Sequence, residues 1–229
     1  LKLGGSAFAQ SLNKIGEEVP TVTKPEYFRE AFNAIQHFID QNWIVAGHDI
    51  SAGGLITALL EMCFPNVDGG LEIDLDIVPE NDLVKILFAE NPGVLIQVRE
   101  PRKVEKYMND NGIGCALLGK PSEERQIVIE KDGAEYLFGI DHLRDVWFES
   151  SYLLERRQST PDCAKARFEN YKLQPLEFVF GKEFNGKLSK YRVSPDRRER
   201  TGIKAAIIRE KGVNGDREMA YSLYLAGFD

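Results

Sequence analysis

Apolar residues recur along this chain in two different patterns, and the way these alternate predicts helices and strands in turn. Recurrence at every third or fourth position predicts helices over residues 6–15, 25–41, 53–64, 81–89, 102–109 and 141–157. Short apolar or alternating runs predict strands over residues 43–47, 71–75, 93–98, 115–118, 126–130 and 135–138. Strands that alternate with helices indicate a layered α/β domain, which we place over residues 1–158.

Several of these elements carry more specific signals. Thr23 is a candidate N-cap and Pro25 suits the first turn of the helix that follows. The amphipathic stripe of that helix consists of Phe28, Phe32, Ile35 and Ile39. Residues 43–47 are predicted to form a buried strand, and the helix over 53–64 is apolar on most sides and should be buried too. Asp132-Gly133 predicts a hairpin between the last two strands.

The periodicity fades after the last of these helices, where polar residues and prolines dominate. Residues 159–201 are therefore predicted to be a linker, because so long a stretch without periodicity is unusual inside a compact domain. A new apolar run at 203–208 predicts a buried strand, and a helix over 216–226 follows it. We interpret residues 202–229 as the first βα unit of a second domain, whose continuation we expect beyond the last residue.

Composition narrows the class of protein. The 229 residues are 43% hydrophobic and 28% charged, and the net charge of −7 argues against a nucleic-acid partner. No apolar run approaches the roughly 18 residues of a membrane-spanning helix, so no membrane partner is expected. The chain begins without Met, and we expect it to start inside a larger protein. One basic run is predicted to be a solvated part of the linker: Arg192, Arg197, Arg198, Arg200 and Lys204.

The cysteines give little sign of chemistry. Cys63, Cys115 and Cys163 are odd in number and far apart, so neither a disulfide framework nor a zinc site is predicted. A reducing cytoplasm fits this usage. No Cys or Ser is paired with a His at a recognisable spacing, and we assign no catalytic nucleophile.

The segment His48-Asp49-Ile50-Ser51-Ala52-Gly53-Gly54 lies between a predicted strand and a predicted helix, where α/β proteins bind ligands. Asp49 offers a hard carboxylate suited to Mg²⁺, and Ser51 offers a hydroxyl at the helix start. Gly53 and Gly54 would let a phosphate approach the helix N-terminus. The same pattern also fits a bare structural role, in which Asp49 or Ser51 caps the helix, the glycines serve packing and His48 is structural.

Three more motifs are weaker in isolation. Leu3-Gly4-Gly5-Ser6 lacks the Gly-Lys-Ser/Thr of a phosphate loop and is interpreted as a structural turn. Phe88-Ala89-Glu90-Asn91-Pro92-Gly93 marks a helix-to-strand corner. Glu90 could face a ligand there, but we expect it to be solvated. Residues 207–215 fit the first strand and loop of an amidotransferase domain, and equally an ordinary βα unit of another doubly wound protein.

Together these segments resemble a known family. Residues 3–6, 48–55, 59–62 and 88–98 are similar to the C-terminal domain of the aminoimidazole ribotide synthase superfamily. Residues 205–229 resemble the start of a flavodoxin-like class I glutaminase domain. The large, single-chain phosphoribosylformylglycinamidine synthases join these two in this order. The resemblance therefore implies an ATP- and glutamine-dependent ligase of purine biosynthesis.

The resemblance also assigns roles to two residues. This family has a catalytic nucleotide site and an auxiliary site that holds ADP with magnesium, and His48-Asp49-Ile50-Ser51 matches a motif of the auxiliary site. It implies that Asp49 is a magnesium ligand and that Ser51 contacts the nucleotide, ATP or ADP. The other ligands would come from remaining domains of the same polypeptide. Ala52 stands where many relatives carry Asp, so no side-chain role is expected there.

In the implied reaction, a glutaminase Cys-His-Glu triad releases ammonia from glutamine. ATP activates the amide oxygen of formylglycinamide ribonucleotide, and ammonia then displaces the phosphate. The nucleophilic Cys would lie beyond Asp229, so this chain alone is predicted to be inactive. Two alternatives stay open. One is another ATPase of the superfamily, such as a selenophosphate synthetase, which would lack the strand at 203–208. The other is a non-catalytic scaffold module that docks the glutaminase.

Overall fold

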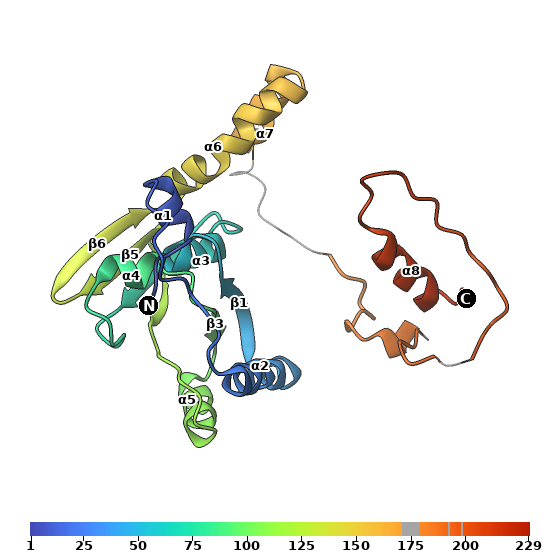
Figure 1. Ribbon diagram of the computed structural model, residues 1–229, viewed down its shortest axis with the longest axis horizontal. Coiled ribbons are helices and arrows are strands. Elements are labelled where there is room, and N and C mark those ends of the chain that lie inside the picture. Colours follow the sequence, from blue (N-terminus) through green and yellow to red (C-terminus); the bar gives the residue numbers. More distant parts are fainter. Residues whose placement is uncertain (171–178, 192, 198) are drawn as a thin grey trace. The chain divides into compact units, whose positions relative to one another are not determined.

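The chain divides into two compact units, Leu1–Leu176 and Glu177–Asp229 (Figure 1). The computed structural model describes residues 1–170, 179–191, 193–197 and 199–229. The larger unit contains almost all of the regular structure and the whole 48–54 segment, so it decides where the candidate site lies.

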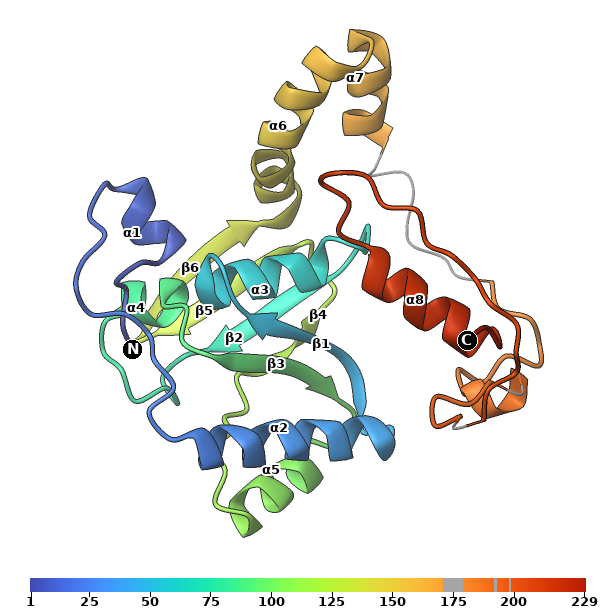
Figure 2. The ribbon, with the colours of Figure 1, turned by 45° about the vertical axis from the view of Figure 1, so that its right-hand side comes forward.

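Two separate sheets form the framework of the larger unit (Figure 2). The four-stranded sheet has the order β4 (Gly119–Ser122), β2 (Gly70–Asp74), β5 (Gln126–Lys131) and β6 (Ala134–Gly139). β2 and β5 run parallel, whereas the other neighbours run antiparallel. The second sheet pairs β1 (Ile44–Ile50) antiparallel with β3 (Gly93–Val98). This mixed α/β arrangement confirms the predicted fold class for the larger unit.

The helices of the larger unit are α1 (Ala7–Ser11), α2 (Pro25–Asp40), α3 (Gly54–Cys63), α4 (Leu83–Phe88), α5 (Pro101–Asp110), α6 (Ile140–Gln158) and α7 (Pro161–Asn170). All but α7 correspond to predicted helices. No helix in the part of the chain that the structure describes is both long and apolar enough to cross a membrane.

The main hydrophobic core lies between α3 and the four-stranded sheet. Leu59 of α3 is 1% exposed, and Ile127 and Ile129 of β5 are 0% exposed. Burying a side chain of this size stabilises the fold by about 1.5–3 kcal/mol. The helix that follows the 48–54 segment is therefore fixed against the sheet, as its apolar sequence predicted.

A second core joins α2 and α5, which lie side by side in Figure 2. Phe38 is fully buried, stacks on Trp43 with 5.3 Å between ring centroids and meets Tyr107 edge-on at 5.1 Å. The ammonium of Lys103 lies 4.1 Å from the centre of the Trp43 ring, which is cation–π geometry. These aromatic contacts anchor α2 at its C-terminal end.

The buried side of α2 differs from the predicted stripe. Ala34 and Phe38 are buried, whereas Phe28, Phe32 and Ile39 are 48%, 56% and 51% exposed. This helix has apolar residues on more than one side, and contacts with α5 and with residues of β1 and β3 decide which side is covered. The predicted stripe is therefore wrong for three of its four members.

Two helix ends also differ from the prediction. α1 stops at Ser11, short of the predicted end at residue 15, because Asn13 has φ +53° and leaves the helical region. α2 does begin on Pro25, but its N-cap is Lys24 rather than Thr23, and no side chain caps it.

β1 is longer and more exposed than the predicted buried strand over 43–47. It spans Ile44–Ile50, and none of its residues is fully buried. Among the strands that the structure describes, β1 pairs with β3 alone, so it stays largely uncovered. Its last residues, His48 to Ile50, are three of the seven residues of the motif that was predicted to lie between a strand and a helix.

The strand predicted at 115–118 lies a few residues later, as β4. The pairing with β2 begins where the apolar run ends, since the backbone N–H of Asp74 donates to the Leu118 carbonyl at 2.7 Å. A Cβ at Gly119 would lie only 1.9 Å from the Glu72 carbonyl oxygen. The two strands can approach this closely because residue 119 has no side chain.

The β5–β6 hairpin confirms the Asp-Gly signal. Asp132 has φ +53° and Gly133 has φ +73°, the pair of left-handed residues that a two-residue hairpin turn requires.

Helix α7 occupies the start of the predicted linker and packs on α6 (Figure 2). Ala164 is fully buried, and the Phe168 ring stacks on Tyr152 at 4.5 Å between centroids. Pro161 opens the helix at a position that prolines favour. The prediction of an irregular chain is therefore wrong for residues 161–170. Other linker residues, 171–178, 192 and 198, lie outside the described residues, and with them Arg192 and Arg198 of the basic run.

The smaller unit contains η2 (Leu188–Tyr191) and α8 (Asp216–Leu225), and α8 confirms the predicted last helix. The prediction of a buried strand at residues 203–208 is wrong. These residues form no strand, and Ile208 is 93% exposed. A strand needs backbone hydrogen bonds to a neighbour along its length. Here one backbone-to-backbone bond is made, from the Asp229 N–H to the Ile203 carbonyl at 2.7 Å.

Arg197 is not solvated as the basic run suggested. Its guanidinium lies 3.1 Å from the Asp229 carboxylate and 4.6 Å from the centre of the Tyr224 ring. Hydrogen bonds from the backbone N–H groups of Thr201 and Gly202, together with Arg197, hold the pKa of the Asp229 carboxyl below its usual value. This cluster joins the end of α8 to the start of the 203–208 segment.

Candidate functional site

The 48–54 segment leads from the end of β1 into α3 through a turn at residues 51–53, called the 51–53 turn below. Asp49 pairs with Val94 in the β1–β3 ladder. Gly53 has φ +88° and Gly54 has φ +74°, conformations that residues with side chains seldom adopt. The N–H of Gly54 donates to the Ser51 carbonyl at 3.0 Å and closes the turn.

Close packing accounts for both glycines. A Cβ at Gly54 would lie 2.6 Å from the Leu87 carbonyl oxygen, because α3 begins directly against α4. A Cβ at Gly53 would lie 2.2 Å from the hydroxyl of Thr57. The structural interpretation of the glycines is thus sufficient by itself.

The structural interpretation also had Asp49 or Ser51 cap the helix, and this part of it is wrong. Neither side chain caps α3, whose N-cap is Gly53. The Asp49 side chain is 74% exposed, and Ser51 is exposed beside it. Both polar groups are therefore presented to solvent at the end of the β1 strand.

Asp49 does not form a metal site with other residues in the described part of the chain. Among the residues that the structure describes, no group of three or more His, Cys, Asp or Glu side chains is placed to hold a metal ion. Mg²⁺ takes about six oxygen ligands, several of which are usually waters or substrate phosphates. One exposed carboxylate suits a single position in such a shell, so Asp49 fits the expected group as one contributor.

His48 has a structural role. Its Nδ1 lies 2.6 Å from the Asp49 carbonyl oxygen, and its Nε2 lies 3.0 Å from a carboxylate oxygen of Glu61. The other oxygen of Glu61 accepts a hydrogen bond from the indole N–H of Trp147 at 3.1 Å. His48 therefore links the end of β1 to α3 and, through Glu61, to α6.

Glu90 was expected to be solvated, and that prediction is wrong. The residue is half-buried, and its Oε1 accepts hydrogen bonds from the backbone N–H of Gly53 and of Ala7, both at 2.8 Å. Its neighbour Asn91 accepts from the N–H of Lys2 at 3.0 Å. The corner between α4 and β3 thus contacts the 48–54 segment and the two residues that flank the Leu3-Gly4-Gly5-Ser6 motif.

The Leu3-Gly4-Gly5-Ser6 motif is a structural turn, as predicted. Ser6 is 1% exposed, and its hydroxyl accepts from the N–H of Ala9 at 3.1 Å while it donates to the Leu3 carbonyl at 2.7 Å. A Cβ at Gly4 would lie 2.3 Å from the Glu18 carbonyl oxygen. The motif therefore caps α1 and packs against the chain that follows it.

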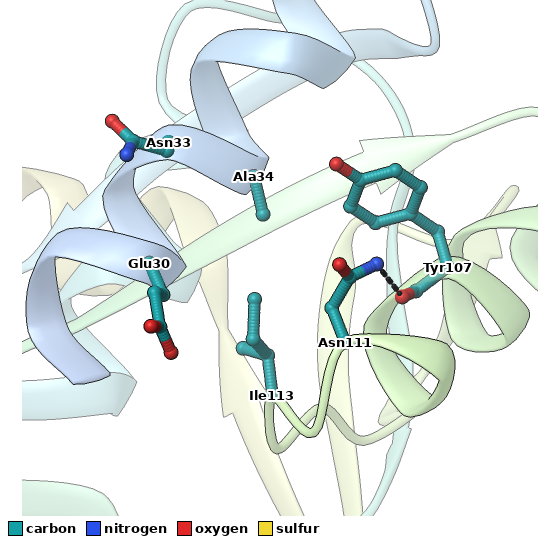
Figure 3. A pocket seen from close by; sticks show the side chains of 6 residues that line it. All are labelled: Glu30, Asn33, Ala34, Tyr107, Asn111 and Ile113. Atoms are coloured by element: carbon teal, nitrogen blue, oxygen red, sulfur yellow. Dashed lines mark hydrogen bonds between the residues drawn. The ribbon is translucent and has the colours of Figure 1, made fainter. Parts of the chain in front are cut away.

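Two clefts of the larger unit lie away from this segment. One, of about 330 Å³, lies between α2 and α5 and is lined by Glu30, Asn33, Ala34, Tyr107, Asn111 and Ile113 (Figure 3). There the Asn111 amide donates to the Tyr107 carbonyl at 2.8 Å and is held in place. Another, of about 580 Å³, lies beside β2 and β4. Neither includes Asp49 or Ser51.

Cys63 and Cys115 do not suggest a nucleophile. Burial raises the pKa of the Cys63 thiol, and the nearby Arg125 only partly opposes this. Partial burial, with Glu105 nearby, raises the pKa of Cys115. A thiol with a raised pKa is protonated and poorly nucleophilic at neutral pH.

Comparison with known proteins places the larger unit in a family. The family described as "AIR synthase related protein, C-terminal domain" matches residues 1–132. The chain belongs to this family. The superfamily resemblance predicted from residues 3–6, 48–55 and 88–98 is thereby confirmed.

Similar proteins match the whole chain. It is 35% identical to phosphoribosylformylglycinamidine synthase of Homo sapiens, over all of this chain and 17% of that protein. It is 33% identical to the probable chloroplastic/mitochondrial phosphoribosylformylglycinamidine synthase of Arabidopsis thaliana, again over all of this chain and 16% of that protein. The chain thus spans about a sixth of the length of these relatives.

Solved structures from Thermotoga maritima are more distant. Phosphoribosylformylglycinamidine synthase II is 14% identical with a TM-score of 0.49, over 62% of this chain and 24% of that one. The PurL structure complexed with ADP is 13% identical with a TM-score of 0.45, over 87% of this chain and 28% of that one.

Proposed function

We propose that this chain is part of a phosphoribosylformylglycinamidine synthase, the ligase that converts formylglycinamide ribonucleotide, ATP and glutamine to the amidine in purine biosynthesis. The observation that carries the proposal is the 35% identity to the human enzyme over the entire chain. The match includes residues 202–229, beyond the 132 residues that the family covers. A synthetase of the same superfamily without a glutaminase would not account for this second part.

In this proposal, residues 1–158 are the aminoimidazole-ribotide-synthase-like C-terminal domain, 159–201 connect it to the next domain, and 202–229 begin a flavodoxin-like glutaminase. The bond between the Asp229 N–H and the Ile203 carbonyl supports the last assignment. In a right-handed βαβ unit the second strand starts beside the start of the first, and Asp229 lies there after α8. Free cysteines fit a reducing compartment such as the cytoplasm.

At the site, Asp49 would be one magnesium ligand and Ser51 would contact the nucleotide, ADP or ATP. The exposure of both side chains and their freedom from helix capping support these roles. The other ligands and the catalytic groups would come from further domains of the same polypeptide. Magnesium would neutralise phosphate charge there, while this chain would contribute the rigid β1–α3 frame that holds Asp49.

The proposal is tested by expressing the complete reading frame that encodes this chain and assaying the protein. The encoded protein should form the amidine when formylglycinamide ribonucleotide, MgATP and glutamine are supplied, with glutamate, ADP and inorganic phosphate as co-products. The 229-residue chain assayed alone should show no turnover. Turnover by the chain alone, or a full reading frame that lacks both an ATP-binding half upstream and a glutaminase Cys downstream, would refute the proposed function.

A further inference from the structure

Helix α3 has no capping side chain of its own. Its N-cap is Gly53, and helix N-termini leave backbone N–H groups without intrahelical partners. Such groups are best satisfied by an oxygen acceptor, and a negative charge suits the positive end of the helix. Here Glu90 supplies both from a different element, through its 2.8 Å bond to the Gly53 N–H.

The 51–53 turn is held on both sides of Gly53. Glu90 fixes its N–H, and the hydroxyl of Thr57 donates to its carbonyl at 3.1 Å. A glycine with φ +88° has wide conformational freedom when nothing restrains it. The exposed side chains of Asp49 and Ser51 do not cap α3, and both remain available to a ligand.

The same corner also holds the N-terminal segment. Oε1 of Glu90 accepts from the Ala7 N–H, Asn91 accepts from the Lys2 N–H, and the Phe88 ring stacks on Phe8 with 4.6 Å between centroids. Figure 2 shows α1 beside α4 accordingly. One carboxylate oxygen therefore joins the starts of α1 and α3.

We infer that Glu90 is a positioning residue of the proposed nucleotide site, which orients the 51–53 turn and with it Ser51. This inference rests on the proposed function for its nucleotide. Glu90 acts through the hydrogen bond that its Oε1 atom accepts from Gly53. Direct contact between Glu90 and the nucleotide is not proposed.

Two conservative variants separate position from charge. Glu90→Gln keeps an acceptor oxygen at the same reach and loses the charge. Glu90→Asp keeps the charge and withdraws the oxygens by one methylene. Glu123→Asp, at an exposed position, is the matched control. The readouts are hydrogen exchange at the Gly53 and Ala7 amides, and MgADP affinity by calorimetric titration of the protein encoded by the complete reading frame.

We expect Glu90→Asp to speed exchange of both amides and to weaken MgADP binding, each by about 10-fold, the size of a lost hydrogen bond to a charged group. Glu90→Gln and the control should stay within about 3-fold of the parent protein in both readouts, since neither withdraws the acceptor.

Three outcomes would overturn the inference. Unchanged exchange in Glu90→Asp would mean that Glu90 does not hold the turn. Faster exchange with unchanged affinity would leave Glu90 a purely structural residue. A larger loss of affinity in Glu90→Gln than in Glu90→Asp would assign the effect to charge. Failure of the parent protein to bind MgADP would instead reject the proposed nucleotide site, before any variant is compared.

Discussion

Gly54 illustrates at the residue scale how packing shapes the candidate site. Its φ is +74°, and a Cβ there would lie 2.6 Å from the Leu87 carbonyl oxygen. Gly133 in the β5–β6 turn has almost the same φ, +73°, but no atom within 4 Å of the position of a Cβ. The two glycines thus have almost the same φ and differ in their surroundings, which makes them a matched pair.

Gly54→Ala should lower the free energy of unfolding by at least about 2 kcal/mol, because a steric clash adds to the strain of a left-handed residue. Gly133→Ala should cost about 1 kcal/mol, from strain alone. Urea unfolding followed by tryptophan fluorescence measures both, since Trp43 and Trp147 lie in the larger unit. Equal losses would show that the approach of α3 to α4 imposes no constraint.

At the scale of elements, α2 carries two apolar sides of which one is covered. Phe38 is fully buried against the aromatic rings of Trp43 and Tyr107, whereas Phe32 on the same helix is 56% exposed. The helix is therefore held by a short stretch near its C-terminal end. Its exposed apolar side chains, such as Phe32, contribute little to the stability of this unit.

Phe38→Ala should destabilise the larger unit by about 3–5 kcal/mol, the usual cost of emptying a buried aromatic position. Phe32→Ala should change the free energy of unfolding by less than about 0.5 kcal/mol, as exposed substitutions do. Thermal or urea unfolding of the two variants checks this. A larger loss for Phe32→Ala would show that the predicted stripe, rather than the observed one, faces the core.

At the scale of the whole molecule, the proposed site needs more than this chain provides. Asp49 is one carboxylate, and the described residues offer no cluster of metal ligands around it. A magnesium–nucleotide complex held by one carboxylate and one hydroxyl would exchange readily with water. Binding should therefore depend on the domains that complete the shell.

MgADP titrated into the 229-residue chain should give weak binding or none, whereas the protein encoded by the complete reading frame should bind it. In that protein Asp49→Asn should weaken binding by about 10-fold or more, because a charged ligand to the metal is lost. Its folding stability should hardly change, since the side chain is 74% exposed. Asp40→Asn, at the exposed end of α2, is the control. Tight binding by the chain alone would contradict this account.

The local pattern of residues was enough to predict several elements of this fold. The buried helix over 53–64, the Asp132-Gly133 hairpin and the long helix that became α6 follow from periodicity and turn chemistry within a few neighbouring residues. The motif that contains Asp49 and Ser51 was equally visible, since strand, turn and helix adjoin along the sequence. What a side chain can do chemically is fixed by its type, and these two needed no structure to be noticed.

Contacts between distant residues decided the rest. Glu90 reaches partners 37 and 83 residues away, so no local pattern could distinguish it from a solvated carboxylate. The exposure of β1 and the open apolar segment at 203–208 depend on which strands lie beside them. The sequence by itself determined where helices, turns and ligand-type side chains occur. The tertiary structure alone decided which faces are covered and which carboxylate holds the 51–53 turn, because burial and hydrogen bonding are properties of neighbours in space.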